Sequence, residues 1–287
     1  MRTDLALERR ESIQGDREIH GVILEEETCA DGKIKVSTVE IKNDHGSKVM
    51  GKPKGTYITV EVEQMNEKDV IRETIVQLKK LLDTNKKKKI LVTGLGNREI
   101  TPDALGPWTI DQLFVTRHLI QEYGEVFQKR NQMRNICAIA PGVMAQTGME
   151  AKEILQGVVE KIKPDVVIVI DALAARSVRR LNRTIQLTNT GISPGAGVGN
   201  NRKALNRETL GVEVIAIGVP TVVDAETIVE DRVEESLRSA GFTQKECELF
   251  VNGIRGQKTK NMFVTSKDVD EEVKQMSYIL SEVVNRF

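Results

Sequence analysis

The fold of this chain is decided by the stretch VVIVIDALAARS, residues 166–177, in which an apolar, β-branched run ends at an aspartate. A second stretch, ILVTGLGNREITPDALGP at residues 90–107, follows the same plan and also reaches an aspartate followed by Ala-Leu. Apolar runs that stop at glycine or polar residues are typical of strands buried on both faces of a parallel sheet. The two stretches therefore predict an α/β fold that carries Asp171 and Asp103 near the ends of buried strands.

Apolar strands and helices alternate along the rest of the chain. Residues 19–63 instead show short alternating segments, which predict antiparallel strands or hairpins with one buried face. We expect a single domain, residues 1–287, whose mostly parallel sheet is covered by helices on both faces and extended by the antiparallel addition at 19–63. Strands are expected at 89–94, 135–140, 165–171 and 212–220, and helices at 67–84, about 102–127, 150–163, 172–180, 224–240 and 267–284.

Composition excludes several classes of protein. The 42 basic residues balance 42 acidic ones, so the chain has no net field that would draw it to nucleic acid or to an anionic membrane. Its three cysteines form no CxxC pair and no cluster with histidine, which argues against a zinc site and a disulfide framework. No apolar run reaches the roughly 18 to 20 residues of a membrane span. We therefore expect a cytoplasmic protein without metal or other cofactor.

The common catalytic and nucleotide-binding motifs are missing. Gly94-Leu95-Gly96 follows a strand, but Glu99 stands where the third glycine of a dinucleotide-binding turn belongs. The sequence also has no GxxxxGK[ST] loop, no GxSxG elbow and no HExxH pair. Nucleotide binding, serine catalysis and zincin chemistry are therefore without support.

Asp103 and Asp171 are the candidate catalytic residues. Thr101-Pro102-Asp103 is also a standard helix start, which is the structural alternative for that aspartate. Asp171 directly follows a buried strand, where an ionised carboxylate must be hydrogen-bonded, metal-bound or shifted in pKa. If both face one crevice, they tend to share a proton, so that one activates water and the other polarises a carbonyl group. The Asp-Thr/Ser-Gly signature is missing, which excludes a pepsin fold but not this chemistry.

A glycine-rich stretch, TGISPGAGVGNNRKAL at residues 190–205, is the candidate substrate-binding loop. Its glycines allow the backbone to approach an extended peptide or to move as a lid, although a plain connection is the alternative. We assign substrate contacts to Gly195, Gly197, Gly199 and Arg202.

The assembled segments resemble the germination protease, or spore protease, family of endospore-forming bacteria. The matching stretches follow one another over nearly the whole chain: RTDLALE, GLGNREITPDALGP, TRHL, APGVMAQTGME, KPDVVIVIDALAARSVRRLN, TIQLTNTGISPGAGVGNNRK, TLGVEVIAIGVPTVVDA and MFVTSKDVD. Together they are far more specific than any single motif.

The resemblance implies an endopeptidase that initiates the degradation of small acid-soluble spore proteins during germination. It implies an atypical aspartic protease whose two essential aspartates fall on Asp103 and Asp171. The fold would be similar to that of the hydrogenase maturation proteases, an α/β sandwich. The resemblance further implies a homotetramer that is made as a zymogen and acts in the spore core.

The N-terminal residues TDLALE resemble the cleavage motif of the family, an acidic residue followed by an apolar one and then Ala-x-Glu. This implies self-cleavage between Asp4 and Leu5, with residues 1–4 as a short pro-segment. The alternative is that these residues only begin an N-terminal element, with Asp4 as a helix cap. Two departures stand out: better-known members carry a longer leader where Met1 directly precedes Arg2 here, and the stretch from about 240 to 261 is shorter.

Two other hypotheses remain at this stage. One is a metal-dependent peptidase in which Asp103, Asp171 and a histidine hold a cation; sensitivity to chelators would distinguish it from the carboxylate pair. The other is a catalytically inert protein that binds spore proteins through the glycine-rich loop. Loss of turnover with retained binding would favour it.

Overall fold

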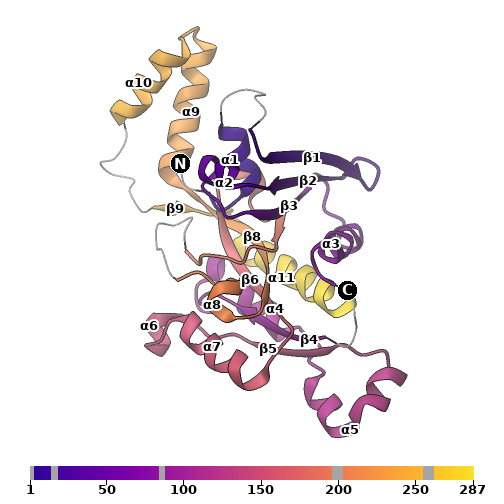
Figure 1. Ribbon diagram of the computed structural model, residues 1–287. Helices are drawn as coiled ribbons and strands as arrows, with labels where there is room; N and C mark the ends of the chain where they lie inside the picture. The colour runs from indigo at the N-terminus through magenta and orange to yellow at the C-terminus, as the bar shows by residue number, and fades with distance from the viewer. Residues whose placement is uncertain (1–2, 14–18, 84–87, 196–202, 255–261) are drawn as a thin grey trace.

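The computed structural model describes residues 3–13, 19–83, 88–195, 203–254 and 262–287. Its described strands form one sheet in the order β1-β2-β3-β7-β8-β6-β4-β5, with β9 paired to β8 (Figure 1). The strands are β1 (Val22–Cys29), β2 (Ile34–Ile41), β3 (Gly55–Val62), β4 (Lys89–Gly94), β5 (Asn135–Ile139), β6 (Val166–Ala175), β7 (Thr184–Thr188), β8 (Glu213–Asp224) and β9 (Phe263–Val264).

The central strands of the sheet are parallel. β5, β4, β6 and β8 run in one direction, and Val92 of β4 pairs with Ile168 of β6, which in turn pairs with Ile215 of β8. Helical connections join β4 to β5 and β5 to β6, as parallel neighbours require. Strands β7, β3, β2 and β1 continue the sheet in antiparallel pairs. The α/β fold with a mostly parallel central sheet and an antiparallel N-terminal addition is confirmed.

Helices cover both faces of the parallel strands. α3 (Glu67–Leu81), α4 (Leu105–Asp111) and α11 (Val269–Arg286) pack on one face, and α7 (Ala151–Ile162) and α8 (Arg207–Leu210) on the other (Figure 1). Alternation along β6 explains these two cores: Ile168 and Ile170 lie in the core under α11, whereas Val167 and Val169 lie in the core under α7. Asp171 continues the second series, so its side chain is on the α7 face.

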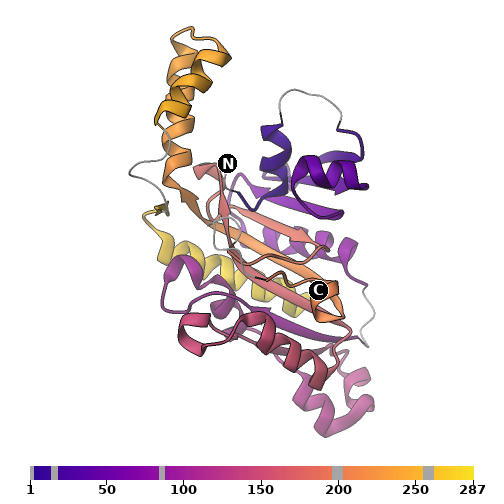
Figure 2. The same cartoon turned by 60° about the vertical axis from the view of Figure 1, so that its left-hand side comes forward.

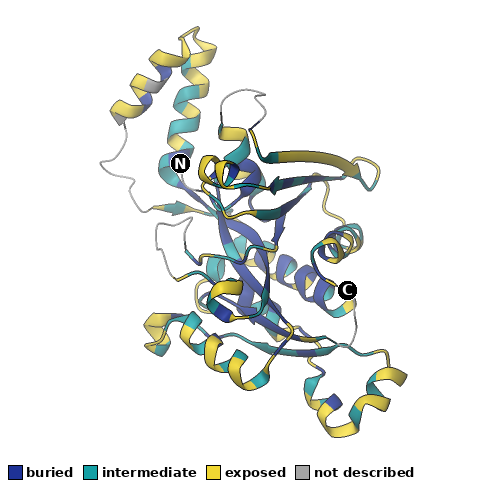
Figure 3. Ribbon diagram, in the orientation of Figure 1, coloured by how far each residue is buried: buried dark blue, intermediate teal, exposed yellow. Residues whose placement is uncertain are grey.

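The remaining helices lie at the edges of this body. α1 (Ala6–Ser12) and α2 (Asp44–Met50) pack on β2 and β3, and α5 (Arg117–Arg130) and α6 (Met144–Thr147) lie near β5. α9 (Ala225–Ser239) and α10 (Gln244–Ile254) form an arm that projects beyond the sheet in both views (Figures 1 and 2). The central strands are almost wholly buried, whereas most residues of this arm are exposed or only partly buried (Figure 3). No helix of the described part of the chain is long and apolar enough to cross a membrane.

The helix predicted at residues 172–180 is wrong. Residues 172–175 continue β6 and pair with β8 as far as Val223, and only a short 3-10 turn, η2 (Val178–Arg180), follows. Pairing with β8 on one side and with Asp4 on the other keeps this Ala-rich run extended, so tertiary contacts override its helix propensity. Asp171 therefore lies in the middle of a strand, not at the junction of a strand and a helix.

The long helix predicted at 102–127 is also wrong, because the chain is divided there into η1 (Thr101–Asp103), α4 and α5. Thr116 ends the first part by binding β5: its N–H donates to Ile136 O over 2.9 Å, and its hydroxyl accepts from Ile136 N–H. The predictions did not include β7 or α10, and α2 forms where a cluster of turns was expected.

Candidate active site

Asp103 lies on η1, in the loop that leaves the end of β4. Its Oδ2 accepts a 2.7 Å hydrogen bond from the N–H of Asn97. Gly96 has a φ of 116°, and a side chain there would collide with the main-chain oxygen of Asp103. On the other side, the Thr221 hydroxyl of β8 donates to Pro102 O over 2.6 Å. Asp103 is thus fixed between the loop after β4 and the strand β8.

Asp171 is buried in β6, with 5% of its surface exposed, and its Oδ1 accepts a 3.0 Å hydrogen bond from the N–H of Ala172. The loop that carries Asp103 begins directly beside it, because the N–H of Leu95 donates to Ile170 O over 2.8 Å. η1 also contacts β6 and β8. The structure therefore brings the segments of the two predicted catalytic residues together at the carboxyl end of the parallel strands, where open α/β sheets place their sites.

A row of three residues crosses the sheet at Asp171. Asp171 pairs with Gly218 of β8, and Gly218 pairs with Gln186 of β7, so all three share one face. Two strand spacings separate the outer members, so their Cα atoms are about 10 Å apart. Gly218 itself carries no side chain, and a Cβ there would collide with the side chain of Leu173. The Asp171 and Gln186 side chains thus flank a gap in the row.

The N-terminal segment, residues 3–8, lies on this same face. Leu5 is fully buried and packs against Leu173 and Ala175 of β6. Asp4 pairs with the end of β6: its N–H donates to Ala174 O, and its Oδ2 accepts from Ala174 N–H, both over 2.9 Å. The segment is extended up to Leu5 and then enters α1.

Two side chains hold the peptide group between Asp4 and Leu5. The Asp4 carbonyl oxygen accepts hydrogen bonds from Lys52 Nζ at 2.8 Å and from Gln186 Nε2 at 3.2 Å. Gln186 Oε1 meanwhile accepts from the N–H of Ala6 at 2.7 Å. Burial lowers the pKa of the Lys52 ammonium, and the nearby charge of Asp4 opposes this. Donors aimed at a carbonyl oxygen favour the negative charge that develops there when its carbon is attacked.

A cavity of about 180 Å³ adjoins this carbonyl group and is lined in part by Asp4, Lys52 and Gln186. Both ends of the predicted substrate-binding loop reach it, since Ser193 and Ala204 also line it. Of the residues assigned to that loop, Gly195 is described and has a φ of 73°. Gly197, Gly199 and Arg202 lie outside the described residues.

Sequence reasoning assigned no role to Lys52 or Gln186. Both carried a weak signal: Lys52 stands in the GKPKG turn between two strands, and Gln186 is the one amide in the apolar run TIQLT. Their common partner, Asp4, is far away in the chain, so no local pattern links the three. A metal-binding geometry was also not predicted: within the described residues, the ligand atoms of Glu27, Cys29 and Glu73 lie within 4.8 Å of one another, on the N-terminal addition.

Residues 2–255 match the model of a protein family described as germination protease. The germination proteases of Clostridium perfringens and Caldanaerobacter subterraneus are each 42% identical to this chain. Each match covers 99% of this chain, and it covers 94% of the first relative and 93% of the second. That of Bacillus subtilis is 41% identical over 97% of this chain and 79% of the relative. Among solved structures, the [NiFe] hydrogenase maturation protease HycI of Thermococcus kodakarensis is similar over 73% of this chain and 99% of that protein. The two sequences are 14% identical and the TM-score is 0.36, so this likeness is too weak to bear on function.

With this fold and these relatives, the protein is a peptidase of the endopeptidase type, built on an α/β sheet. The chain belongs to the germination protease family.

Proposed function

We propose that this chain initiates the degradation of small acid-soluble spore proteins during germination, with Asp103 and Asp171 as an acid–base pair. One observation carries the proposal: the Asp4 carbonyl, which belongs to the bond implied for self-cleavage, lies on the face of Asp171 and receives hydrogen bonds from two side chains. Residues 3–8 then model how a substrate lies on the enzyme.

In the proposed reaction, one aspartate accepts a proton from water while the water oxygen bonds to the carbonyl carbon. Lys52 and Gln186 stabilise the resulting negative oxygen. The other aspartate holds a proton in the same site, and a proton passes to the nitrogen as the C–N bond breaks. The products are a new carboxylate and a new amine.

The chain's own N-terminus is the first substrate under this proposal. Cleavage between Asp4 and Leu5 removes residues 1–4, and until then residues 3–8 block the site, which is zymogen behaviour. The resemblance also implies a homotetramer in the spore core, and we extend this assembly and this location to the chain as proposals. Light scattering of the purified protein tests the tetramer.

The glycine-rich loop is proposed to bind substrate. The support is local: Ser193 and Ala204, at its two ends, line the cavity beside the Asp4 carbonyl. Gly195, Gly197 and Gly199 would let its backbone approach a peptide, and Arg202 would contact it.

The decisive experiment replaces each aspartate by asparagine. Asp103→Asn and Asp171→Asn should each abolish cleavage of an acid-soluble spore protein and leave the N-terminus intact by mass analysis, because the two carboxylates act as a unit. Asp111→Asn is the matched control, since Asp111 is exposed and pairs with Arg98. Wild-type turnover in either folded variant would remove that aspartate from the mechanism.

A further inference from the structure

Glu8 is a charged residue that the proposed reaction does not use, yet it is among the most deeply buried acidic residues of the described chain, with 2% of its surface exposed. It lies at the end of the N-terminal segment, on the first turn of α1. Burying a carboxylate is costly unless hydrogen bonds and an opposite charge compensate for it. The surroundings of Glu8 supply both.

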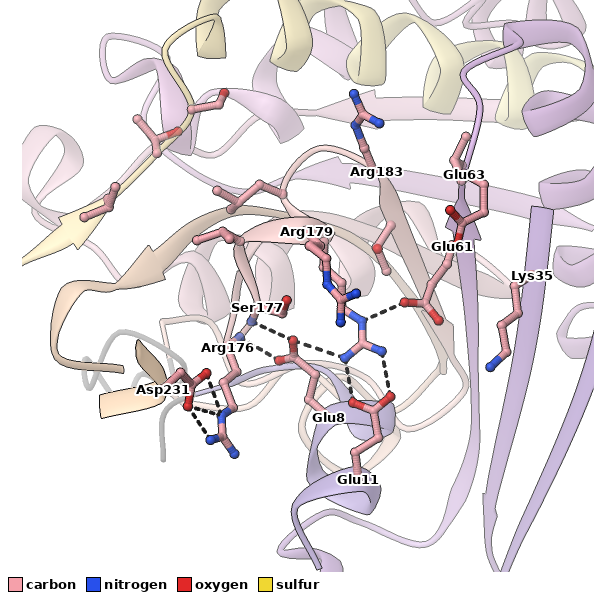
Figure 4. A pocket seen from close by; sticks show the side chains of 18 of the residues that line it. Glu8, Glu11, Lys35, Glu61, Glu63, Arg176, Ser177, Arg179, Arg183 and Asp231 are labelled. Atoms are coloured by element: carbon pink, nitrogen blue, oxygen red, sulfur yellow. Dashed lines mark hydrogen bonds and ion pairs between the residues drawn. The ribbon is translucent and has the colours of Figure 1, made fainter. Parts of the chain in front are cut away.

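Four groups bind the Glu8 carboxylate. Oε2 accepts from the N–H of Arg176 at 2.7 Å and from the hydroxyl of Thr3, and Oε1 accepts from the N–H of Ser177 at 3.0 Å. Arg180 adds its charge, with Nη1 3.3 Å from Oε1. Figure 4 shows the Glu8 carboxylate facing Arg176 and Ser177. We call the two N–H groups and the Arg180 guanidinium the carboxylate cradle.

The cation of the cradle is held in place without Glu8. Arg180 Nε donates to Glu61 over 2.7 Å, and Nη2 donates to Glu11 over the same distance. Burial lowers the pKa of Arg180, but the hydrogen bonds to Glu11 and Glu61 outweigh it and raise that pKa above its ordinary value. The guanidinium is therefore charged at any pH at which the protein is folded.

The spacing links the cradle to the cleaved bond. Glu8 is the fourth residue after the Asp4–Leu5 bond, and the same stretch is anchored at Asp4 by β6 and at Ala6 by Gln186. A substrate that replaces residues 3–8 on this surface, in the same register, brings its own fourth residue to the cradle.

We propose that Arg180, together with the N–H groups of Arg176 and Ser177, determines specificity by binding the glutamate of the Ala-x-Glu motif, which is the fourth residue after the cleaved bond. This inference rests on the proposed function, because it takes residues 3–8 as the model of a bound substrate. In the full chain Glu8 occupies the subsite, and an acidic peptide takes its place.

A large cavity next to the cradle gives such a peptide access. It has a volume of about 1040 Å³ and is lined by Glu8, Arg176 and Arg180 among others (Figure 4). Among the described residues that line it, five acidic and five basic side chains remain when Glu8 is left out. The charged group nearest to the position that Glu8 leaves is the Arg180 guanidinium, which favours an acidic side chain there.

The experiment compares two peptides that contain the chain's own sequence, one with TDLALE and one with glutamine in place of its final glutamate. We expect the full-length wild type to cleave the glutamate peptide with a kcat/KM at least about tenfold higher, the scale of a lost charge-assisted hydrogen bond. In Arg180→Gln the ratio of kcat/KM between the two peptides should shrink to less than about threefold.

Arg179→Gln is the matched control, because Arg179 lies on the same 3-10 turn and is exposed. It should keep the wild-type preference. An unchanged preference in Arg180→Gln, or an equal loss in Arg179→Gln, overturns the proposal. If Arg180→Gln does not fold, Arg180→Lys replaces it: lysine keeps the charge but loses the fork of donors, and again an unchanged preference overturns the proposal.

The experiment also distinguishes failure of the proposed function from failure of the proposed subsite. If wild type cleaves neither peptide, the reaction proposed above is wrong, and equilibrium binding of the same peptides still tests the cradle. Tighter binding of the glutamate peptide that is lost in Arg180→Gln supports the subsite, and equal binding of the two peptides contradicts it.

Discussion

The N-terminal segment and the arm of α9 and α10 both leave the central sheet, but they treat their side chains in opposite ways. The segment buries Leu5 and even Glu8, and its polar groups bind β6, β7 and the loop at Lys52. The arm exposes apolar residues instead: Leu249 is 73% exposed and Phe250 is 54% exposed.

This difference shows at which positions the contacts of the folded chain determine the identity of the residue. A buried carboxylate such as Glu8 is tolerated only where donors and a cation fit it, so both sides of that contact are fixed together. An exposed leucine costs the folded chain little, so its identity is not determined by the contacts of this fold. Substitutions should therefore have large effects in the segment and small effects on the arm.

The largest effect is expected from Glu8→Ala. It leaves the Arg180 charge and two N–H groups without their carboxylate, which should lower the free energy of unfolding by about 3 kcal/mol. Glu11→Ala is the matched control, because Glu11 also binds Arg180 but its side chain is 51% exposed, and it should cost less than about 1 kcal/mol. Denaturant unfolding measures both, and equal losses would show that the burial of Glu8 has no special role.

Lys52→Met should slow cleavage at Asp4–Leu5 by roughly 10- to 100-fold, because one donor to the carbonyl oxygen is lost. Lys54→Met is the control: Lys54 is exposed and pairs with Asp44 at 2.8 Å. Mass analysis of the N-terminus over time gives the rates. A Lys52→Met rate equal to that of wild type would remove Lys52 from the reaction.

The pH dependence of the same reaction gives a sharper test of Lys52. Burial lowers the pKa of this ammonium, so its charge is lost as the pH rises through a value below that of an ordinary lysine. The rate should fall on that alkaline limb, and Lys52→Arg should move the limb to higher pH because arginine stays charged. A limb that does not move in Lys52→Arg must come from another group.

Gly195→Val should reduce cleavage of an intact spore protein by roughly three- to tenfold, because its φ of 73° disfavours a β-branched residue at one end of the loop. Gly211→Val is the control, since Gly211 has a φ of 71° but caps α8 and does not line the cavity. Similar melting temperatures with a loss of cleavage in Gly195→Val alone would support a role in substrate binding. Unchanged kinetics would leave the loop as a connection, and the same test applies to Gly197→Val.

The smallest effect is expected on the arm. Leu249→Ser should change the free energy of unfolding by less than about 0.5 kcal/mol. Val251→Ser, on the same helix but only 7% exposed, should cost about 1 to 2 kcal/mol. If Leu249→Ser is the more destabilising of the two, the exposed face of α10 is covered in solution, and the contrast with the N-terminal segment fails.

The sequence predicts those parts of the fold in which local pattern and tertiary contact agree. β4 and β6 are apolar on both faces, so their burial between two layers of helices follows from their composition. Residues 172–175 are also apolar, but their alanines favour a helix, and only pairing with β8 and Asp4 makes them a strand. β7 was missed for a similar reason, because its five residues are too short to stand out.

The candidate site divides in the same way. Asp103 and Asp171 could be proposed as candidates from the sequence, because Asp171 directly follows the apolar run VVIVI and Asp103 follows the run ILVTG and its glycine turn. Lys52 and Gln186 could not, because the atom that they share, Asp4 O, lies 48 and 182 residues away in sequence. No periodicity or motif connects residues at such distances, and the folded chain alone brings them together.

Under the proposed function, in which residues 3–8 lie as a substrate does, two of their main-chain N–H groups limit which proteins can be cleaved. The N–H of Asp4 donates to Ala174 O, and the N–H of Ala6 donates to Gln186 Oε1. A proline has no N–H, so a peptide with proline at either place loses one of these bonds and leaves a buried acceptor unpaired. We therefore expect that a protein with proline at either position is cleaved slowly, even where its side chains fit the site.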